Sequence, residues 1–281
     1  RLSTCLMPIF FLLMVGLAAY SLLLPGSEAG LAYLFQFSWS TVTPQAILNA
    51  MGFTFFSLSL GAGVLVTYGA YVNKSTRLPS AAMWVAILAL QAAILAGLVI
   101  MPAVFAYGLE PDAGPGLVFI TLPMIFAQLS GGSIVAVIFY FCLFVAALTS
   151  AISLLEVAVA FLQNECRFSR RAAVFLCFAA LFILGSVSAL SFGPWNDCLI
   201  FGRSIFDFLD YVCTNFLMTI NGLAVAFVVG WKAWPKAMKE LSTCSPENGV
   251  VTKGTLSAIG FGLRWLAPLM VLASCWQGLE A

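Results

Sequence analysis

The sequence predicts an all-α, polytopic membrane protein. Composition, long apolar windows and the placement of basic residues support this fold class. Of the 281 residues, 62% are hydrophobic and only 8% are charged, and the mean hydropathy is +1.06. A soluble domain carries roughly 25% charged residues, so this chain lacks the polar side chains that a water-exposed surface requires. We therefore predict a single transmembrane domain over residues 1–281.

Seven long apolar windows account for most of the chain. They cover residues 5–24, 45–72, 82–107, 132–162, 172–190, 205–231 and 256–276. A helix needs about 20 apolar residues to cross a hydrocarbon core roughly 30 Å thick, so we expect about seven transmembrane helices. Residues 117–126 separate the third and fourth windows and contain Pro123. We expect them to form a short helix outside the bilayer.

Basic residues are concentrated on alternate loops and termini. One set of loops holds Arg1, Lys74, Arg77, Arg167, Arg170, Arg171, Lys232, Lys236, Lys239 and Lys253. The opposite set holds Arg203 with Glu28, Glu110, Asp112, Asp197, Asp207 and Asp210. The positive-inside rule then places the N-terminus of this chain in the cytoplasm. Because the chain begins with Arg1 and shows no signal peptide, we expect it to be the later part of a longer protein.

Several function classes are disfavoured by what the sequence lacks. The net charge of +1 gives no basic field for nucleic acid. His is absent, which removes the commonest general base and metal ligand. The eight cysteines form no C-x-x-C pair, and no hydrolase motif is present. We expect a protein that is not an enzyme and that uses no organic cofactor.

The second window contains small and polar residues near its centre, namely Ser57, Ser59, Gly61 and Gly63. One interpretation is a discontinuous helix, whose unwound carbonyls would coordinate a cation and whose half-helix N-terminus would face a carboxylate. The other is a close contact between helices through small residues, which is common in membranes. The glycines alone favour the second interpretation, and the first stays open.

The fourth window carries a polar stripe. Ala146, Thr149, Ser150, Ser153 and Glu156 are spaced by three or four residues, so they share one helix face. Hydroxyl and carbonyl oxygens suit a hard monovalent cation. The same stripe would also serve as a hydrogen-bonded seam between helices. Glu156 is a functional candidate as an intramembrane acid, although it lies toward the cytoplasmic end and could be hydrated there.

Four stretches together resemble the neurotransmitter:sodium symporter family, particularly its bacterial amino-acid transporters. They are FFSLSLGAGVLVTYGAY (55–71), FITLP (119–123), FVAALTSAIS (144–153) and, in weaker form, FLQNECRFSR (161–170). In the register of that family, the chain is similar to helices five to eleven of a fold built from two inverted five-helix repeats. The resemblance implies a bacterial cell-membrane protein that couples sodium to a small amino-acid substrate. Helices one to four, or another chain, would be needed to complete each site.

The resemblance also implies roles for individual residues. One sodium site would use Ala146, Thr149 and Ser150, and the other would use Ser57. The substrate pocket would include Phe56, Ser57, Ser59, Gly61, Ala62 and Leu154. Asp210 matches an outer gate residue, and Asn164 an inner one. A small Ala62, where relatives carry a large side chain, would leave room for a bulkier substrate.

Some positions depart from the pattern of the family. Leu88 and Ala89 stand where an Asn or Asp would face the Ser57 sodium site, and Phe53 replaces a frequent Gln. Asn164 stands where relatives carry an Asp that pairs with an N-terminal Arg. We therefore expect a sodium-coupled amino-acid symporter, present as a C-terminal fragment. The alternative is a non-transporting remnant with only a structural or interaction role.

Overall fold

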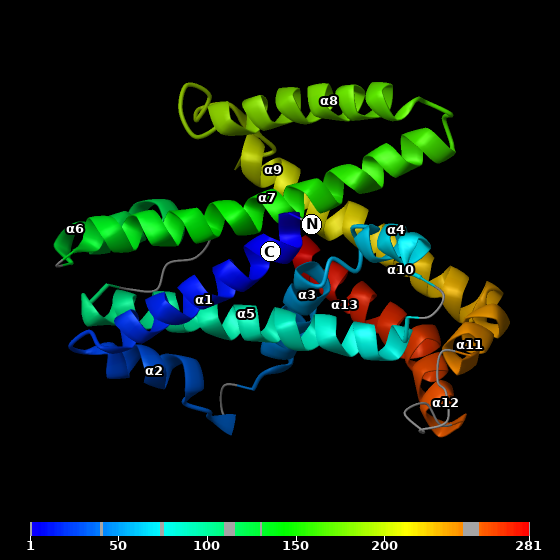
Figure 1. The fold of residues 1–281 in the computed structure, drawn as a ribbon, viewed down its shortest axis with the longest axis horizontal. Coiled ribbons are helices and arrows are strands. Elements are labelled where there is room, and N and C mark those ends of the chain that lie inside the picture. Colours follow the sequence, from blue (N-terminus) through cyan, green and yellow to red (C-terminus); the bar gives the residue numbers. More distant parts are fainter. Residues whose placement is uncertain are drawn as a thin grey trace. The chain divides into compact units, whose positions relative to one another are not determined.

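The computed structural model describes residues 2–39, 42–73, 76–109, 116–129, 131–243 and 253–280 (Figure 1). Contacts divide the chain into two compact units. Unit 1 comprises Arg1–Ser40 and Ala86–Ile152, and unit 2 comprises Thr41–Val85 and Ser153–Ala281. The boundary falls within two continuous helices, α5 (Leu78–Ala106) and α7 (Gly132–Asn164). Of the charged residues behind the predicted orientation, Arg1, Lys74, Glu110 and Asp112 lie outside the described residues.

Unit 1 is built around the larger apolar core. Besides its parts of α5 and α7 it contains α1 (Leu2–Leu22), α2 (Ser27–Phe35), the π-helical segment η2 (Leu117–Thr121) and α6 (Leu122–Gln128). The core brings together Met14 and Leu17 of α1, Val104 of α5 and Ile125 of α6. The predicted loop helix is therefore present as η2 and α6. Its apolar face packs into this core, because burying such a face removes it from contact with water.

Unit 2 contains the remaining elements. They are α3 (Pro44–Ser57), α4 (Val64–Tyr71), α8 (Arg170–Leu190), β1 (Leu199–Ile200), β2 (Arg203–Ser204), α9 (Ile205–Tyr211), η3 (Val212–Met218), α10 (Thr219–Phe227), η4 (Val228–Lys232), α11 (Trp234–Thr243), α12 (Lys253–Phe261), η5 (Gly262–Leu266) and α13 (Ala267–Glu280). Segments α9 to η4 follow one another with helical backbone throughout and form one span, Ile205–Lys232. The segments η3 and η4 are π-helical within this span.

Five helices among the described residues are long and apolar enough to cross a membrane. They are Leu78–Ala106, Gly132–Asn164, Arg170–Leu190, Ile205–Lys232 and Leu256–Ala273. These correspond to the last five of the seven predicted windows. The first window is helical as α1, and a bend of 116° separates Leu6–Leu22 from Ser27–Phe35. The count becomes six if this bent pair is one span. The second window is divided into α3 and α4, of 14 and 8 residues.

A short hairpin leads into the span that begins at α9. Strands β1 and β2 are antiparallel, with Ile200 opposite Arg203. Phe201 and Gly202 between them both have positive φ, at 51° and 79°. Positive φ at both central residues is typical of the tight turn that matches the twist of two antiparallel strands. Ser204 then caps α9, since its hydroxyl oxygen accepts the N–H of Asp207 at 3.2 Å.

Candidate binding site at a broken helix

The second predicted window is broken at its centre. Helix α3 ends at Ser57 and α4 begins at Val64, with turns over residues 58–63 (Figure 1, blue to cyan). Ser59 has φ 52°, in the left-handed region, where a residue other than glycine is uncommon. Gly63 also has positive φ, at 75°, immediately before α4. Unfavourable backbone of this kind is concentrated at functional sites, so the break is the first candidate for one.

Hydrogen bonds define the path of the chain through the break. The Ser59 N–H donates to the Phe56 carbonyl at 2.9 Å, and the Ala62 N–H donates to the Ser59 carbonyl at 3.2 Å. The regular bonding of α4 starts where the Gly63 carbonyl accepts the Thr67 N–H at 3.0 Å. The Gly61 carbonyl lies before that point, and it accepts a bond from the Asn221 amide of α10 at 2.7 Å.

The structure contains both the discontinuity and the close contact that the glycines suggested, while cation coordination by the unwound carbonyls stays a prediction. The helix is discontinuous, and Gly61 is also a close-contact position. A Cβ on Gly61 would clash with the Met218 carbonyl at the end of η3. On the other side, a Cβ on Gly222 of α10 would clash with the ring of Phe55. The α3–α4 segment therefore packs against η3 and α10 through two residues that have no side chain, Gly61 and Gly222.

The predicted substrate residues fall mainly on this segment. Phe56 and Ser57 are exposed at the end of α3, Ser59 and Ala62 are half-buried within the break, and Gly61 is buried. Leu154 lies apart in sequence, exposed on α7. Its neighbour Ser153 joins that helix to α4, because the Tyr68 hydroxyl donates to Ser153 Oγ at 2.7 Å. The polar stripe thus provides a bond between two helices at this position.

The predicted sodium ligands of α7 can be described within unit 1. The Thr149 hydroxyl lies 2.9 Å from the Ala146 carbonyl oxygen and 3.1 Å from the Val145 carbonyl oxygen. Two oxygens assigned to one cation therefore already lie side by side on a single helix face. Thr149 is half-buried, and Ser150 is exposed on the next position. Neutral oxygen donors of this kind suit a hard cation such as sodium.

The predicted gate residues are exposed. Asp210 accepts a long bond of 3.5 Å from the Thr214 hydroxyl, one turn further along the same span. Asn164 is the last residue of α7. Glu156 is not an isolated acid, because its two carboxylate oxygens accept bonds from Arg170 at 2.9 and 3.1 Å. This ion pair joins α7 to the start of α8, and Arg170 is exposed in it, so Glu156 is a paired acid at a solvent-accessible position.

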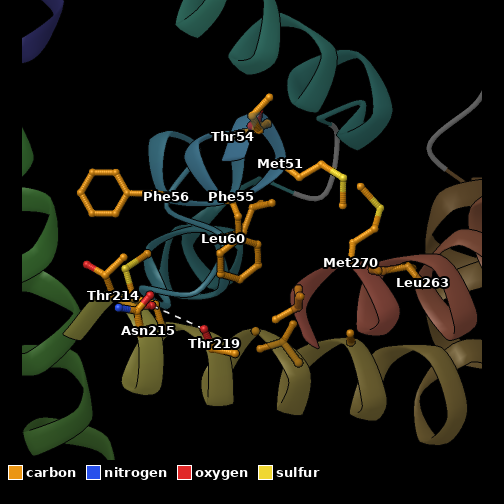
Figure 2. Close-up of a pocket in the computed structure, with 18 of the residues that line it drawn as sticks. Met51, Thr54, Phe55, Phe56, Leu60, Thr214, Asn215, Thr219, Leu263 and Met270 are labelled. Carbon is orange, nitrogen blue, oxygen red and sulfur yellow. Dashed lines mark hydrogen bonds between the residues drawn. The ribbon is translucent and has the colours of Figure 1, made fainter. Parts of the chain in front are cut away.

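An apolar cavity of about 660 Å³ lies on another side of α3 (Figure 2). Its walls come from α3, from η3 and α10, and from η5 and α13. In Figure 2 the ring of Phe56 points away from Met270, which lies on the opposite side of the cavity. Of the predicted substrate residues, Phe56 alone is among those that line it. The cavity therefore adjoins the break, since Leu60 also lines it, but it contains only one of the predicted substrate residues.

Sequence reasoning missed three polar residues that hold unit 2 together. Asn221 and Tyr68 make the bonds to Gly61 and Ser153 described above. Arg264 donates to the Gly230 carbonyl at 2.6 Å and lies 5.5 Å from the ring of Trp234. A signal was present for Asn221 and Arg264, since a polar side chain within an apolar window requires a partner in the protein.

Comparisons with known proteins agree with this architecture. The sequence profile of the sodium:neurotransmitter symporter family matches residues 2–257. An uncharacterized sodium-dependent transporter of Haemophilus influenzae is 38% identical over 269 residues, which cover 95% of this chain and 57% of that protein. The uncharacterized sodium-dependent transporter YhdH of Bacillus subtilis is 33% identical over 272 residues, covering 97% of this chain and 60% of that protein.

A solved structure is similar over nearly the whole chain. The crystal structure of MhsT in complex with L-phenylalanine matches with a TM-score of 0.84 and 41% sequence identity. The match covers 98% of this chain and 61% of that one. The chain thus spans about three fifths of the length of these relatives.

Proposed function

Because the chain belongs to the sodium:neurotransmitter symporter family, we propose that it forms part of a sodium-coupled amino-acid symporter. The observation that carries this proposal is the break at residues 58–63, in the middle of an apolar segment and with a strained Ser59. In lipid, irregular backbone is tolerated only where it is buried in protein or lines a cavity. Secondary transporters use such broken helices to bind substrate and ions.

In this proposal, roles are assigned to the residues of the break and to the predicted sodium ligands of α7. Substrate binds at the break, with Ser59 and Ala62 beside it and Phe56 as an outer lid. Sodium binds to the Ala146 carbonyl and to the hydroxyls of Thr149 and Ser150. A ligand shifts a conformational equilibrium only by its difference in affinity for the two states. Sodium bound first would favour the outward-facing state, and rocking of one helix bundle against the other would then release substrate inward.

Two observations support a proposal for the substrate class. MhsT has been solved with L-phenylalanine, and this chain has alanine at position 62. We propose that a large apolar amino acid fits beside Ala62. We also propose that segments beyond the three fifths spanned by this chain complete the sodium and substrate sites.

The test is sodium-dependent binding of labelled amino acids, L-phenylalanine among them, to the complete purified protein. We expect Thr149→Val to weaken binding at least tenfold at a fixed sodium concentration, because it replaces a cation ligand with a methyl group of similar shape. Thr54→Val is the matched control. Thr54 makes the same type of bond to its own helix, to the Ala50 carbonyl at 2.7 Å, but is not assigned to either site.

The outcomes distinguish a sodium-coupled symporter from a non-transporting relative. Sodium-dependent binding that survives Thr54→Val and is lost in Thr149→Val supports the symporter. If folded wild-type protein binds no amino acid, the apolar Phe53 and Leu88 become the decisive residues. The protein would then be a non-transporting relative.

A further inference from the structure

Asn221 reaches from α10 into the break of the α3–α4 segment. Its side-chain amide donates to the Gly61 carbonyl at 2.7 Å, and the two residues are 160 positions apart in the sequence. Asn221 is half-buried, in the middle of a span of 28 residues. An amide in the middle of a span is costly unless it has a partner in the protein, and its partner here is the break.

The contact between α10 and the break extends over both sides of this bond. Before the break, Gly222 packs against the ring of Phe55 so closely that a Cβ would not fit. Within the break, Gly61 packs equally closely against the Met218 carbonyl. After the break, a Cβ on Gly63 would lie only 3.8 Å from the Asn221 amide nitrogen. η3 and α10 therefore pack closely against the segment before and within the break, and Asn221 also lies near Gly63 at the start of α4.

The Gly61 carbonyl needs a donor from outside its own segment. It precedes the first regular bond of α4, and a membrane interior offers little water to satisfy a free carbonyl. Gly61 also lies inside the turn that the Ala62 N–H closes onto the Ser59 carbonyl at 3.2 Å. Fixing the Gly61 carbonyl therefore fixes the orientation of this turn, including the left-handed Ser59.

We propose that Asn221 is a positioning residue for the substrate site. Its amide holds the Gly61 carbonyl and so keeps Ser59 and Ala62 in the arrangement that binds substrate. The statement that the break binds an amino acid rests on the proposed function. The statement that Asn221 holds the break in place is independent of transport.

The test uses two measurements on the complete protein. Hydrogen–deuterium exchange reports the opening of residues 58–67 in sodium without substrate, and equilibrium binding reports the Kd for L-phenylalanine. Asn221→Leu keeps the approximate shape and removes the donor. We expect exchange in this peptide to become at least tenfold faster, and L-phenylalanine binding to become about tenfold weaker. Asn221→Gln keeps an amide donor and should stay within threefold of wild type.

Thr219→Val is the matched control on the same helix. The Thr219 hydroxyl bonds within its own span, to the Thr214 carbonyl at 3.4 Å, and does not reach the break. We expect this variant to stay within twofold in both measurements. If Asn221→Leu cannot be purified, Asn221→Ser should show the same losses, because its hydroxyl is too short to reach Gly61.

Each outcome decides a separate claim. Unchanged exchange in Asn221→Leu would overturn the inference, and so would equal losses in Asn221→Gln, since shape rather than the donor would then matter. If wild-type protein shows no sodium-dependent binding, the proposed function fails. Faster exchange of residues 58–67 in Asn221→Leu would still support the role of Asn221 in holding the break.

Discussion

The chain changes direction sharply in two apolar segments, and the two interruptions are built differently. Between α1 and α2 the chain bends by 116° at Gly26, a glycine with φ 86°. Between α3 and α4 the left-handed positions are Ser59 and Gly63. A glycine adopts positive φ without strain, whereas a serine in the same region has an unfavourable conformation. Glycine therefore occupies the left-handed position of the α1–α2 corner, whereas serine occupies one of the two left-handed positions of the α3–α4 break.

The two interruptions also differ in where their hydrogen-bond partners lie along the chain. At the α1–α2 corner, the Ser27 hydroxyl donates to the Leu22 carbonyl at 2.9 Å, and the Ser27 N–H donates to the Leu24 carbonyl at 3.1 Å. All of these groups lie within six residues of one another. At the α3–α4 break, the Gly61 carbonyl depends on Asn221 of a distant helix. The corner also has a contact to a distant helix, because the Ser21 hydroxyl donates to the Val99 carbonyl of α5 at 2.8 Å. The difference lies in the turns themselves, since the turn groups of the corner bond locally, whereas a carbonyl within the break is bonded from another helix.

The largest expected effect is the difference in L-phenylalanine binding between two glycine-to-alanine substitutions, Gly61→Ala in the break and Gly26→Ala in the corner. In Gly61→Ala the new Cβ meets the Met218 backbone, which cannot move without displacing its helix. Overpacking of this kind costs about 1–3 kcal/mol, so we expect L-phenylalanine binding to weaken by up to about a hundredfold. In Gly26→Ala the nearest atom, Ala106 Cα, is 3.5 Å away. Only backbone strain of about 1–2 kcal/mol should appear, as a lower melting temperature with unchanged binding.

Equal loss of binding in both variants would remove the distinction between the corner and the break. Binding should therefore be measured on material that elutes as a single species, with the melting temperature recorded for both proteins. A Gly61→Ala protein with normal affinity would show that the break is not close to the bound substrate.

A smaller effect is expected from filling the space beside the break. Ala62 is half-buried next to Gly61, and the family resemblance implies that a larger side chain stands there in relatives. Ala62→Phe should weaken L-phenylalanine binding about tenfold while leaving L-alanine within threefold, since a pocket for an apolar side chain discriminates mainly by size. Competition of both amino acids against one labelled ligand measures this ratio. Parallel losses for both would indicate damage to the fold rather than a smaller pocket.

Local patterns in the sequence predicted the spans, and they predicted the break only as one of two possibilities. Ser57, Ser59, Gly61 and Gly63 are as compatible with a close helix contact as with an unwound segment, and the structure uses them for both. The corner at Gly26 lies just beyond the window ending at residue 24, although the Pro-Gly pair there is a known turn signal.

Partners distant in the sequence could not be predicted from periodicity. The Asn221 amide and the Gly61 carbonyl meet only after the chain has passed through the helices from α4 to α9. Glu156 was singled out correctly as an unusual acid, but its partner Arg170 lies beyond the turn at the end of α7. A periodic pattern reports which face of a helix is polar. It does not report which other helix that face meets.

The smallest effect is expected at the α1–α2 corner. Ser27 is 5% exposed, and Ser27→Ala removes the donor to the Leu22 carbonyl without changing the backbone. A buried carbonyl that loses its partner costs about 1 kcal/mol, which should lower the melting temperature by a few degrees. L-phenylalanine affinity should stay within twofold, because the Ser27–Leu22 bond is local to the corner and neither residue is assigned to the proposed sites. If affinity instead fell tenfold at an unchanged melting temperature, the α1–α2 corner would be coupled to substrate binding, and a local hydrogen bond would no longer distinguish a structural turn from a functional one.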